Sequence, residues 1–262
     1  MNELEGAVIV EFPLRGEWIA VTSPGDRIPS HGVDMLGQRY AYDFIRTDRR
    51  RGMNVHPGSG WRTNIFGGRT RECYAWGQPV HMPFDGEVVA ALDGYPERGW
   101  VLPTRELALA LKNALTYNPT RGLQPVVGNF VVARSNDDVF AAFAHLTTGS
   151  VAVAAGQAVS AGDVIGRVGH TGNSTAPHLH FQLMDGPDPI TASGVPCAFR
   201  ELEIERDGGW ERVRDVVPRR QDRIRSEISR DPPPSPPRSR CQAFASPDTA
   251  PIRPAARRTD PP

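Results

Sequence analysis

Short runs of apolar and β-branched residues, separated by Gly, Asn, Asp and Pro, recur through the first 215 residues. Runs of this kind, bounded by turn residues, predict β-strands. They occupy residues 7–12, 18–22, 39–45, 86–91, 128–133, 139–145 and 178–183. βαβ units would alternate strands with helices, but only one helical pattern lies among these runs. The sequence therefore predicts a mainly β domain, built from an antiparallel β-sheet or sandwich.

The interruption is the segment Thr104 to Thr116, TRELALALKNALT, which has helical periodicity. Thr104 is a suitable N-cap, and leucines at 107, 109, 111 and 115 give a broad apolar face, so we expect one inserted helix within about residues 95–123. The region Arg46–Tyr74 has few strand signals and many Arg and Gly residues. We expect a long loop there, which either covers a site or is a surface excursion.

The composition changes after residue 215. Residues 216–262 are rich in Pro, Arg, Ser and Asp and contain few large apolar residues. Such a segment cannot bury enough surface to offset the entropy lost on ordering. The sequence therefore predicts one β domain over residues 1–215 and a disordered C-terminal tail over 216–262.

Charge and composition exclude several classes of protein. Thirty Lys and Arg balance thirty Asp and Glu, which argues against binding nucleic acid or an anionic membrane through bulk charge. No window reaches the roughly 18 apolar residues of a membrane span. Glu3 and Glu5 stand where a signal peptide would be basic, so no export signal is visible and a cellular location is not assigned. The three cysteines are too scattered for a disulfide framework.

The histidines carry the candidate chemistry. His178 and His180 form an H-x-H pair in the strand-like run HLHFQL. Strand alternation puts both on one face and points Leu179 and Phe181 to the core. Two imidazoles on one face can share a metal ion, or one can bind it while the other transfers protons. Two structural histidines that only make hydrogen bonds are the alternative.

Other ionisable residues stand in apolar surroundings. His145 ends the run VFAAFAH, and Asp43 lies within QRYAYDF, where an acid is costly unless it is paired or bound to a cation. Upstream, SHGVD supplies His31 and Asp34. Two histidines and one carboxylate are a known ligand set for Zn²⁺, so the sequence contains the ingredients of a zinc site.

Longer stretches resemble one family. Residues 76–94, WGQPVHMPFDGEVVAALDG, are similar to the G-x-P-V-x-A-x-x-x-G-x-V segment of the M23 metallopeptidases, the lysostaphin or LytM-like zinc endopeptidases. Residues 128–185 resemble the core of that family, from GNFVVA through FAHL to GHTGNSTAPHLHFQL. The resemblance implies a lysostaphin-type, duplicated-hybrid-motif-like fold. It also implies zinc-dependent hydrolysis of peptide bonds in peptidoglycan or in another Gly-rich peptide.

The resemblance also implies roles for three histidines. In M23 enzymes the second His of H-x-H is a zinc ligand, which corresponds to His180. The first His of that pair is catalytic, which corresponds to His178. The His of the family's Y-A-H-L is catalytic as well, which corresponds to His145.

The other two ligands come, in the family, from an H-x-x-x-D motif that this sequence lacks. His31 and Asp34 are three residues apart, and Arg39 occupies the position four before Asp43. We expect Asp43 to keep the strand position and His31 to reach the metal from the preceding loop. The alternative is that His31 pairs with Asp34 through a β-bulge.

The remaining histidines are assigned no chemistry. His56 and His81 are expected on the surface. His170 is expected in a loop or at the rim of the site, since it lies in the turn before the H-x-H pair.

Two other functions are compatible with parts of the chain. Residues 151–169 also resemble the half-repeat of biotinyl and lipoyl carrier domains. Those domains need an acceptor lysine at a hairpin tip, and the sole lysine, Lys112, lies on the predicted helix. The second alternative is a catalytically degenerate M23-like domain that binds or regulates cell-wall components. The altered first motif favours it, and the presence of His145, His178 and His180 argues against it.

Overall fold

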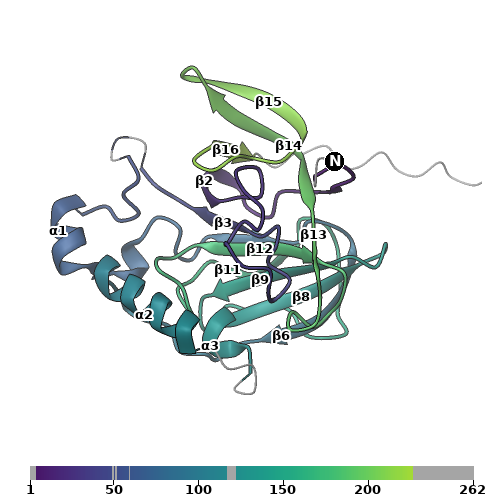
Figure 1. Cartoon of the computed structure of the whole chain (residues 1–262), viewed down its shortest axis with the longest axis horizontal. Coiled ribbons are helices and arrows are strands. Elements are labelled where there is room, and N and C mark those ends of the chain that lie inside the picture. The colour runs from purple at the N-terminus through teal and green to yellow at the C-terminus, as the bar shows by residue number, and fades with distance from the viewer. Residues whose placement is uncertain (1–3, 49, 51, 59, 117–121, 227–262) are drawn as a thin grey trace, which may run out of the picture. The chain divides into compact units, whose positions relative to one another are not determined.

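The structure is a computed structural model that describes residues 4–48, 50, 52–58, 60–116 and 122–226 (Figure 1). The large sheet contains β1 (Val8–Val10), β2 (Gly16–Thr22), β3 (Tyr42–Ile45), β6 (Gly86–Leu92), β8 (Asn129–Ser135), β9 (Phe140–Leu146), β10 (Ala158–Val159), β12 (Leu179–Met184), β13 (Gly194–Val195), β14 (Cys197–Arg206), β15 (Gly209–Val216) and β16 (Arg223–Ser226). Two small sheets pair β5 (Pro79–His81) with β11 (Val164–Arg167) and β4 (Gly68–Arg69) with β7 (Trp100–Val101). The helices are α1 (Gly60–Phe66), α2 (Pro103–Thr116), α3 (Gln124–Val127) and the 3₁₀ turn η2 (Thr70–Glu72).

The mainly β fold expected from the sequence is confirmed. The strand order of the large sheet is β1-β14-β16-β2-β3-β12-β9-β8-β6-β10, with β13 beside β12 and β15 beside β14. Each of the seven predicted runs overlaps one of these strands. The sheet is antiparallel except at one place, where β1 and β14 pair in parallel.

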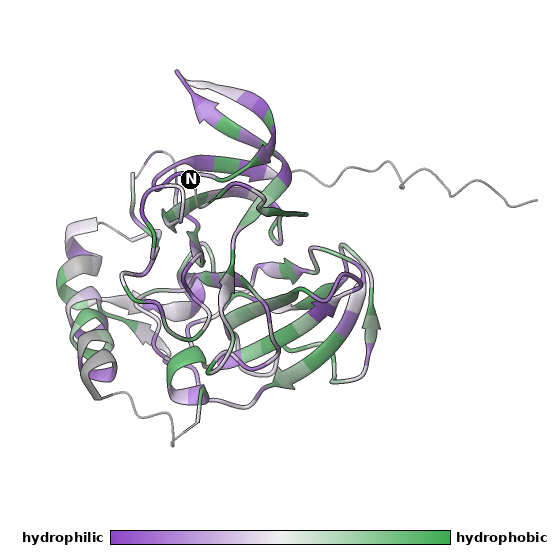
Figure 2. Ribbon diagram, turned by 45° about the vertical axis from the view of Figure 1, so that its right-hand side comes forward, coloured by the Kyte–Doolittle hydropathy of each residue, from purple (hydrophilic) through white to green (hydrophobic). Residues whose placement is uncertain are grey.

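Strand alternation divides the large sheet into a core face and an outer face, and Figure 2 shows hydrophobic and hydrophilic residues alternating along its strands. Phe143, Phe181 and Phe199 lie on the core face and are fully buried. They belong to one apolar cluster with Val80 of β5 and Ile165 of β11, so the small β5–β11 sheet helps to cover this face. The opposite face carries a second, smaller apolar cluster, with Ala142 and Ala144 of β9 and Met184 of β12, next to polar side chains of β3 and β12.

The predicted boundary at residue 215 is wrong by at least one strand. β16 lies between β14 and β2 in the large sheet, and its Ile224 is fully buried. The segment RIRS alternates, so one isoleucine reaches the core while the flanking arginines stay outside, which the Pro- and Arg-rich composition conceals. The rest of the predicted tail, 227–262, lies outside the described residues.

The strands β14 and β15 form a hairpin that projects from the sheet (Figure 1). Residues of opposite charge face each other across it, Glu201 opposite Arg214 and Glu203 opposite Arg212. Such cross-strand pairs stabilise a hairpin without burial. In β14, Leu202 and Ile204 alternate with glutamates and are buried, which is a strand signal that the sequence prediction missed.

The predicted helix is present as α2, although Leu107 of its expected apolar face is not buried. The Leu107 side chain is 66% exposed, whereas Glu106 is fully buried. The region expected to be a loop, 46–74, contains α1, β4 and η2. Within the described part of the chain, every helix is too short or too polar to cross a membrane.

Candidate metal centre

The outer face of two neighbouring strands brings the first two candidate ligands together. In the antiparallel pair of β3 and β12, His180 stands directly opposite Asp43. Their chain neighbours Tyr42 and Phe181 are fully buried in the core, so the alternation of each strand turns Asp43 and His180 to the other face. His180 Nδ1 lies 2.9 Å from Asp43 Oδ1.

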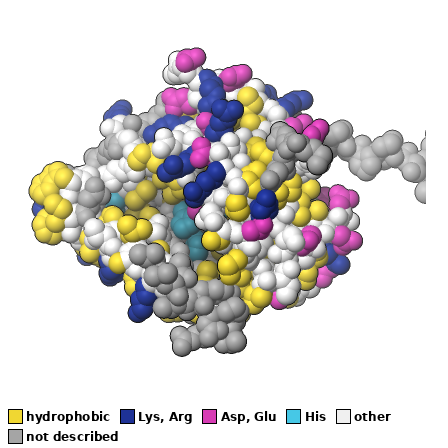
Figure 3. All heavy atoms as spheres, in the orientation of Figure 1, with side chains coloured by type: hydrophobic (Ala, Val, Ile, Leu, Met, Phe, Trp, Pro, Cys, Tyr) yellow, Lys and Arg dark blue, Asp and Glu magenta, His cyan; other side chains and the backbone are white. Residues whose placement is uncertain are grey.

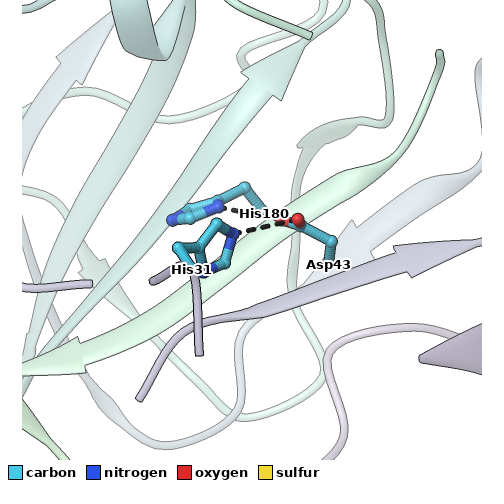
Figure 4. A group of neighbouring side chains, drawn as sticks. All are labelled: His31, Asp43 and His180. Carbon is cyan, nitrogen blue, oxygen red and sulfur yellow. Dashed lines mark hydrogen bonds and ion pairs between the residues drawn. The ribbon is translucent and has the colours of Figure 1, made fainter. Parts of the chain in front are cut away.

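The third residue arrives from a loop. His31 precedes β3 by eleven residues, and its Nε2 lies 2.9 Å from Asp43 Oδ2 (Figure 4). One ligand atom from each of His31, Asp43 and His180 falls within 4.8 Å of the other two. Two imidazole nitrogens and a carboxylate oxygen in such a cluster are a donor set that a divalent metal ion can share.

Hydrogen bonds on the far side of each ligand orient it. The Nε2–H of His180 donates to Gln182 Oε1 over 2.9 Å, and the amide nitrogen of Gln182 donates to the Leu36 carbonyl, which fixes the direction of that amide. His180 Nδ1 therefore keeps its lone pair for the cluster. The Thr22 hydroxyl donates to Asp43 Oδ2, and Ser30 Oγ lies 3.1 Å from His31 Nδ1. Supporting contacts of this kind are usual around metal ligands.

The alternative carboxylate is engaged elsewhere. Asp34 is exposed and its Oδ2 accepts a hydrogen bond from Arg39 over 2.6 Å. Among the described residues, the cluster that could hold a metal ion contains Asp43 and does not contain Asp34.

Two further imidazoles border the cluster. His178 Nε2 lies 3.5 Å from Asp43 Oδ1, and the ring centroids of His145 and His178 are 4.7 Å apart. His178 Nδ1 lies 2.7 Å from the Ala176 carbonyl, and His145 Nδ1 lies 2.9 Å from the Thr171 carbonyl. A carbonyl can only accept, so both rings carry a proton on Nδ1, and in its neutral form each has a free lone pair on Nε2.

A β-bulge delivers His145 to this face. In the register of β8 and β9, Ala144 and His145 together stand opposite the single residue Phe130. His145 has a φ of 62°, the left-handed region that side chains rarely adopt. The extra residue allows Phe143 and Leu146 both to reach the core, while His145 turns away from it towards His178 and His180.

The ionisation of the site follows from burial and from the neighbouring charges. Burial alone raises the pKa of the Asp43 carboxyl, but the His31 and His178 imidazoles and the hydrogen bonds with His178 and His180 outweigh it and bring the pKa well below its usual range. Burial lowers the pKa of His180, and its bonding to Asp43 more than reverses this effect. Burial, with the nearby His178 and His180, holds the pKa of His145 well below its ordinary value.

The cluster opens into a cleft of about 250 Å³. Figure 3 shows histidine side chains at the bottom of a hollow, among hydrophobic groups. The apolar part of the lining includes Val127 of α3 and Phe130, Val132, Ala142 and Ala144 of β8 and β9. The cleft can therefore receive a chain with small apolar side chains beside the candidate metal ligands.

Three histidines lie elsewhere than expected. His56 and His81, predicted on the surface, are both buried. His170 is in a loop as predicted, but it is fully buried rather than at a rim. Its Nδ1 lies 3.0 Å from Ser174 Oγ, which in turn lies 3.1 Å from His178 Nδ1.

Several residues around the site were not predicted. Ser174 and Gln182 contact the candidate histidines, and Glu106 is buried close to His170. The single acid among the leucines of TRELALAL was the one available signal, because a carboxylate in apolar surroundings calls for a buried partner.

Comparison with known proteins identifies the segment that carries these histidines. Residues 115–192 match the model of Peptidase family M23. A stretch of 76 residues, 28% of this chain, is 37% identical to the peptidoglycan DD-endopeptidase ShyA of Vibrio cholerae, of which it covers 17%. A stretch of 82 residues, 31% of this chain, is 37% identical to the DD-carboxypeptidase/endopeptidase Mpg of Neisseria meningitidis, of which it covers 18%. The aligned part thus spans less than a fifth of these curated relatives.

Solved structures give weaker likenesses. The catalytic domain of lysostaphin from Staphylococcus simulans aligns with a TM-score of 0.33 and 19% identity, over 71% of this chain and 88% of that one. A zinc-containing peptidase from Vibrio cholerae aligns with a TM-score of 0.32 and 19% identity, over 72% of this chain and 37% of that one. The sequence match is the stronger finding: residues 115–192, which include His145, His178 and His180, match peptidase family M23.

Proposed function

We propose that this protein is a zinc-dependent endopeptidase that hydrolyses peptide bonds in peptidoglycan stem peptides or cross-bridges. The observation that carries the proposal is that a three-residue donor cluster is bordered by two imidazoles, each held by a backbone carbonyl at its Nδ1. In this proposal His31, Asp43 and His180 hold Zn²⁺, and His145 and His178 are catalytic. The donor set of two histidines and one carboxylate fits zinc.

When bound, Zn²⁺ supplies a Lewis acid that polarises a carbonyl and lowers the pKa of water. The protein's own groups handle the proton. His178 is the proposed general base, because its Nε2 has a lone pair and lies 3.5 Å from the Asp43 carboxylate, whose negative charge stabilises an imidazolium. His145 stays neutral because of its lowered pKa, so its Nε2 accepts a hydrogen bond and orients the attacking water.

The substrate class rests on the relatives and on the cleft. Both curated relatives quoted above are named for endopeptidase activity, and one of them for peptidoglycan. The apolar lining next to the cluster suits peptides of small residues, such as alanine or glycine. We therefore propose peptidoglycan, or a Gly-rich peptide, as the substrate.

Zinc content measured together with cleavage of purified peptidoglycan tests the proposal. The wild type should bind one zinc per chain and release peptides. The His180→Ala variant should lose both properties, because two ligands hold zinc poorly. The His178→Ala variant should keep zinc and lose about 10²–10⁴-fold in kcat, the usual contribution of a general base.

Two results would contradict it. Full hydrolysis by His178→Ala would remove His178 from its catalytic role. A wild-type protein that binds zinc and peptidoglycan without cleaving it would instead indicate the catalytically degenerate binding module.

A further inference from the structure

We infer that Arg98, anchored by Glu106 of α2, is a positioning residue for His178. It would act through the loop of residues 169–177, which leads into the H-x-H pair. The inference rests on the catalytic role proposed for His178. Arg98 and Glu106 both precede the segment that matches the M23 family model, which starts at residue 115.

The guanidinium of Arg98 uses all three nitrogens to join the segment of residues 97–113, called the insertion below, to this loop. Its Nε donates to Glu106 Oε2 over 2.9 Å. Its Nη1 donates to the Gly172 carbonyl over 2.7 Å, and its Nη2 to the Ser174 carbonyl over 2.6 Å. A planar guanidinium fixes the relative position of its partners, because its donors lie in a rigid fork.

The loop transmits this position to His178. Ser174, whose carbonyl is held by Arg98, places its hydroxyl 3.1 Å from His178 Nδ1 and donates it to the Ala176 carbonyl over 2.7 Å. The same Ala176 carbonyl accepts the Nδ1 proton of His178. A shift of Ser174 would therefore disturb both bonds that fix the tautomer and the direction of the His178 ring.

The insertion holds the loop at further points. Glu97 Oε1 accepts the backbone N–H of His170 over 2.7 Å, and Glu97 Oε2 accepts the indole N–H of Trp76. Asn113 of α2 donates its side-chain amide to Asn173 Oδ1 over 3.0 Å. The loop is thus tied at residues 170, 172, 173 and 174, by side chains from residues 97–113.

A contribution to the stability of the fold does not by itself explain why the Glu106 carboxylate is buried. Glu106 is fully buried and pairs with Arg98 at 2.9 Å and Arg105 at 2.7 Å. Removing a carboxylate from water is expensive, and a buried ion pair is often no more stable than apolar residues of similar volume. Its geometric effect is specific, however, because Glu106 holds the Nε side of Arg98 while the other two nitrogens face the loop.

The test compares Arg98→Met and Arg98→Lys with the control Arg105→Lys. The two lysine variants keep the charge near Glu106, but only the change at Arg98 removes the fork that spans two loop carbonyls. Measurements are zinc per chain, kcat and KM on peptidoglycan fragments, and the ring ¹⁵N shifts of His178. We expect Arg98→Met to lower kcat about 100-fold, the typical cost of misplacing a catalytic group by about 1 Å. KM and zinc content should stay at the wild-type level.

The ring shifts of His178 should move from the Nδ1–H tautomer towards a mixture in both Arg98 variants and stay unchanged in Arg105→Lys. If Arg98→Met does not fold, Arg98→Lys gives the same readout in a charge-compensated protein. A folded Arg98 variant with wild-type kcat and wild-type His178 shifts would overturn the inference. If the wild type cleaves no peptidoglycan, the proposed function fails, and the His178 shifts still decide the positioning role.

Discussion

His145 shows how one residue's backbone can place a functional group. Its left-handed φ of 62° turns the imidazole out of the core and towards His178. This conformation is unfavourable by about 1–2 kcal/mol for a residue with a Cβ, whereas glycine adopts it freely. Strain of this kind is often found at functional sites. Substitutions of His145 can therefore distinguish the effect of its backbone conformation on stability from the effect of its imidazole on activity.

We predict that His145→Ala and His145→Gly both keep zinc and both lose activity, since neither has an imidazole. The glycine variant should be the more stable of the two. Its relief of about 1–2 kcal/mol in the left-handed region exceeds the roughly 0.4–1 kcal/mol that glycine loses through the entropy of the unfolded chain. Urea unfolding of the two variants measures the difference. A more stable alanine variant would contradict the left-handed conformation.

His170 links a single residue to the acid stability of the protein. Burial, followed by the charges of Arg98, His178 and Arg105, lowers its pKa to about 3. Glu106 Oε2, 3.6 Å from its Nε2, would favour an imidazolium, but two arginines already neutralise that carboxylate. The folded protein therefore keeps this ring neutral at pH values where an unfolded chain protonates it.

Because the pKa of His170 is depressed on folding, its neutral form contributes stability above about pH 6.5 that is lost as the pH falls towards 3. Between pH 7.5 and pH 5 we predict that the wild type loses about 2 kcal/mol more unfolding free energy than His170→Gln, at about 1.4 kcal/mol per pH unit below 6.5. Urea unfolding of both proteins at each pH, with a chelator present, measures the free energies of unfolding. Equal pH slopes in the two proteins would contradict a buried neutral His170.

At the scale of elements, β16 is the strand that lies within the segment predicted to be a tail. It lies between β14 and β2, with Ile224 opposite Ile204 and Trp18. All three side chains are buried. Its removal would expose apolar surface and leave the neighbouring strands without a hydrogen-bonding partner.

We predict that a chain ending at Ser226 unfolds at the same urea concentration as the full chain. A chain ending at Asp215 should be less stable by at least about 1.5–3 kcal/mol, the contribution of burying one isoleucine side chain. Circular dichroism in increasing urea compares the two truncations. Equal stability of the two truncated chains would show that the core forms without β16. A chain ending at Ser226 that is less stable than the full chain would contradict the predicted tail.

At the scale of the whole molecule, the candidate site combines residues of the large sheet with residues of the segments between its strands. β3, β9 and β12 contribute Asp43, His145 and His180 on one face. His31 and the 169–177 loop bring the remaining groups to the same face from outside the strands. The insertion that contains Arg98 and Glu106 contacts that loop rather than the candidate ligands.

The sequence by itself determined what depends on short-range order. Alternation predicted the strands, and it predicted that Leu179 and Phe181 face the core while His180 faces outward, since neighbouring side chains of a strand point to opposite faces. The aromatic surroundings of Asp43 predicted an acid that needs a partner. These inferences need only a few consecutive residues, and so they could be made without the fold.

The tertiary structure alone decided the contacts between distant segments. The spacing of His31 and Asp43 follows no strand or helix period, so only the path of the loop could bring them to 2.9 Å. Arg98 contacts carbonyls 74 and 76 residues further along the chain. The burial of Glu106 and His170 depends on those same contacts. Local patterns indicate the face of a strand on which a side chain lies. Its contacts depend on the packing of elements that are far apart in the sequence.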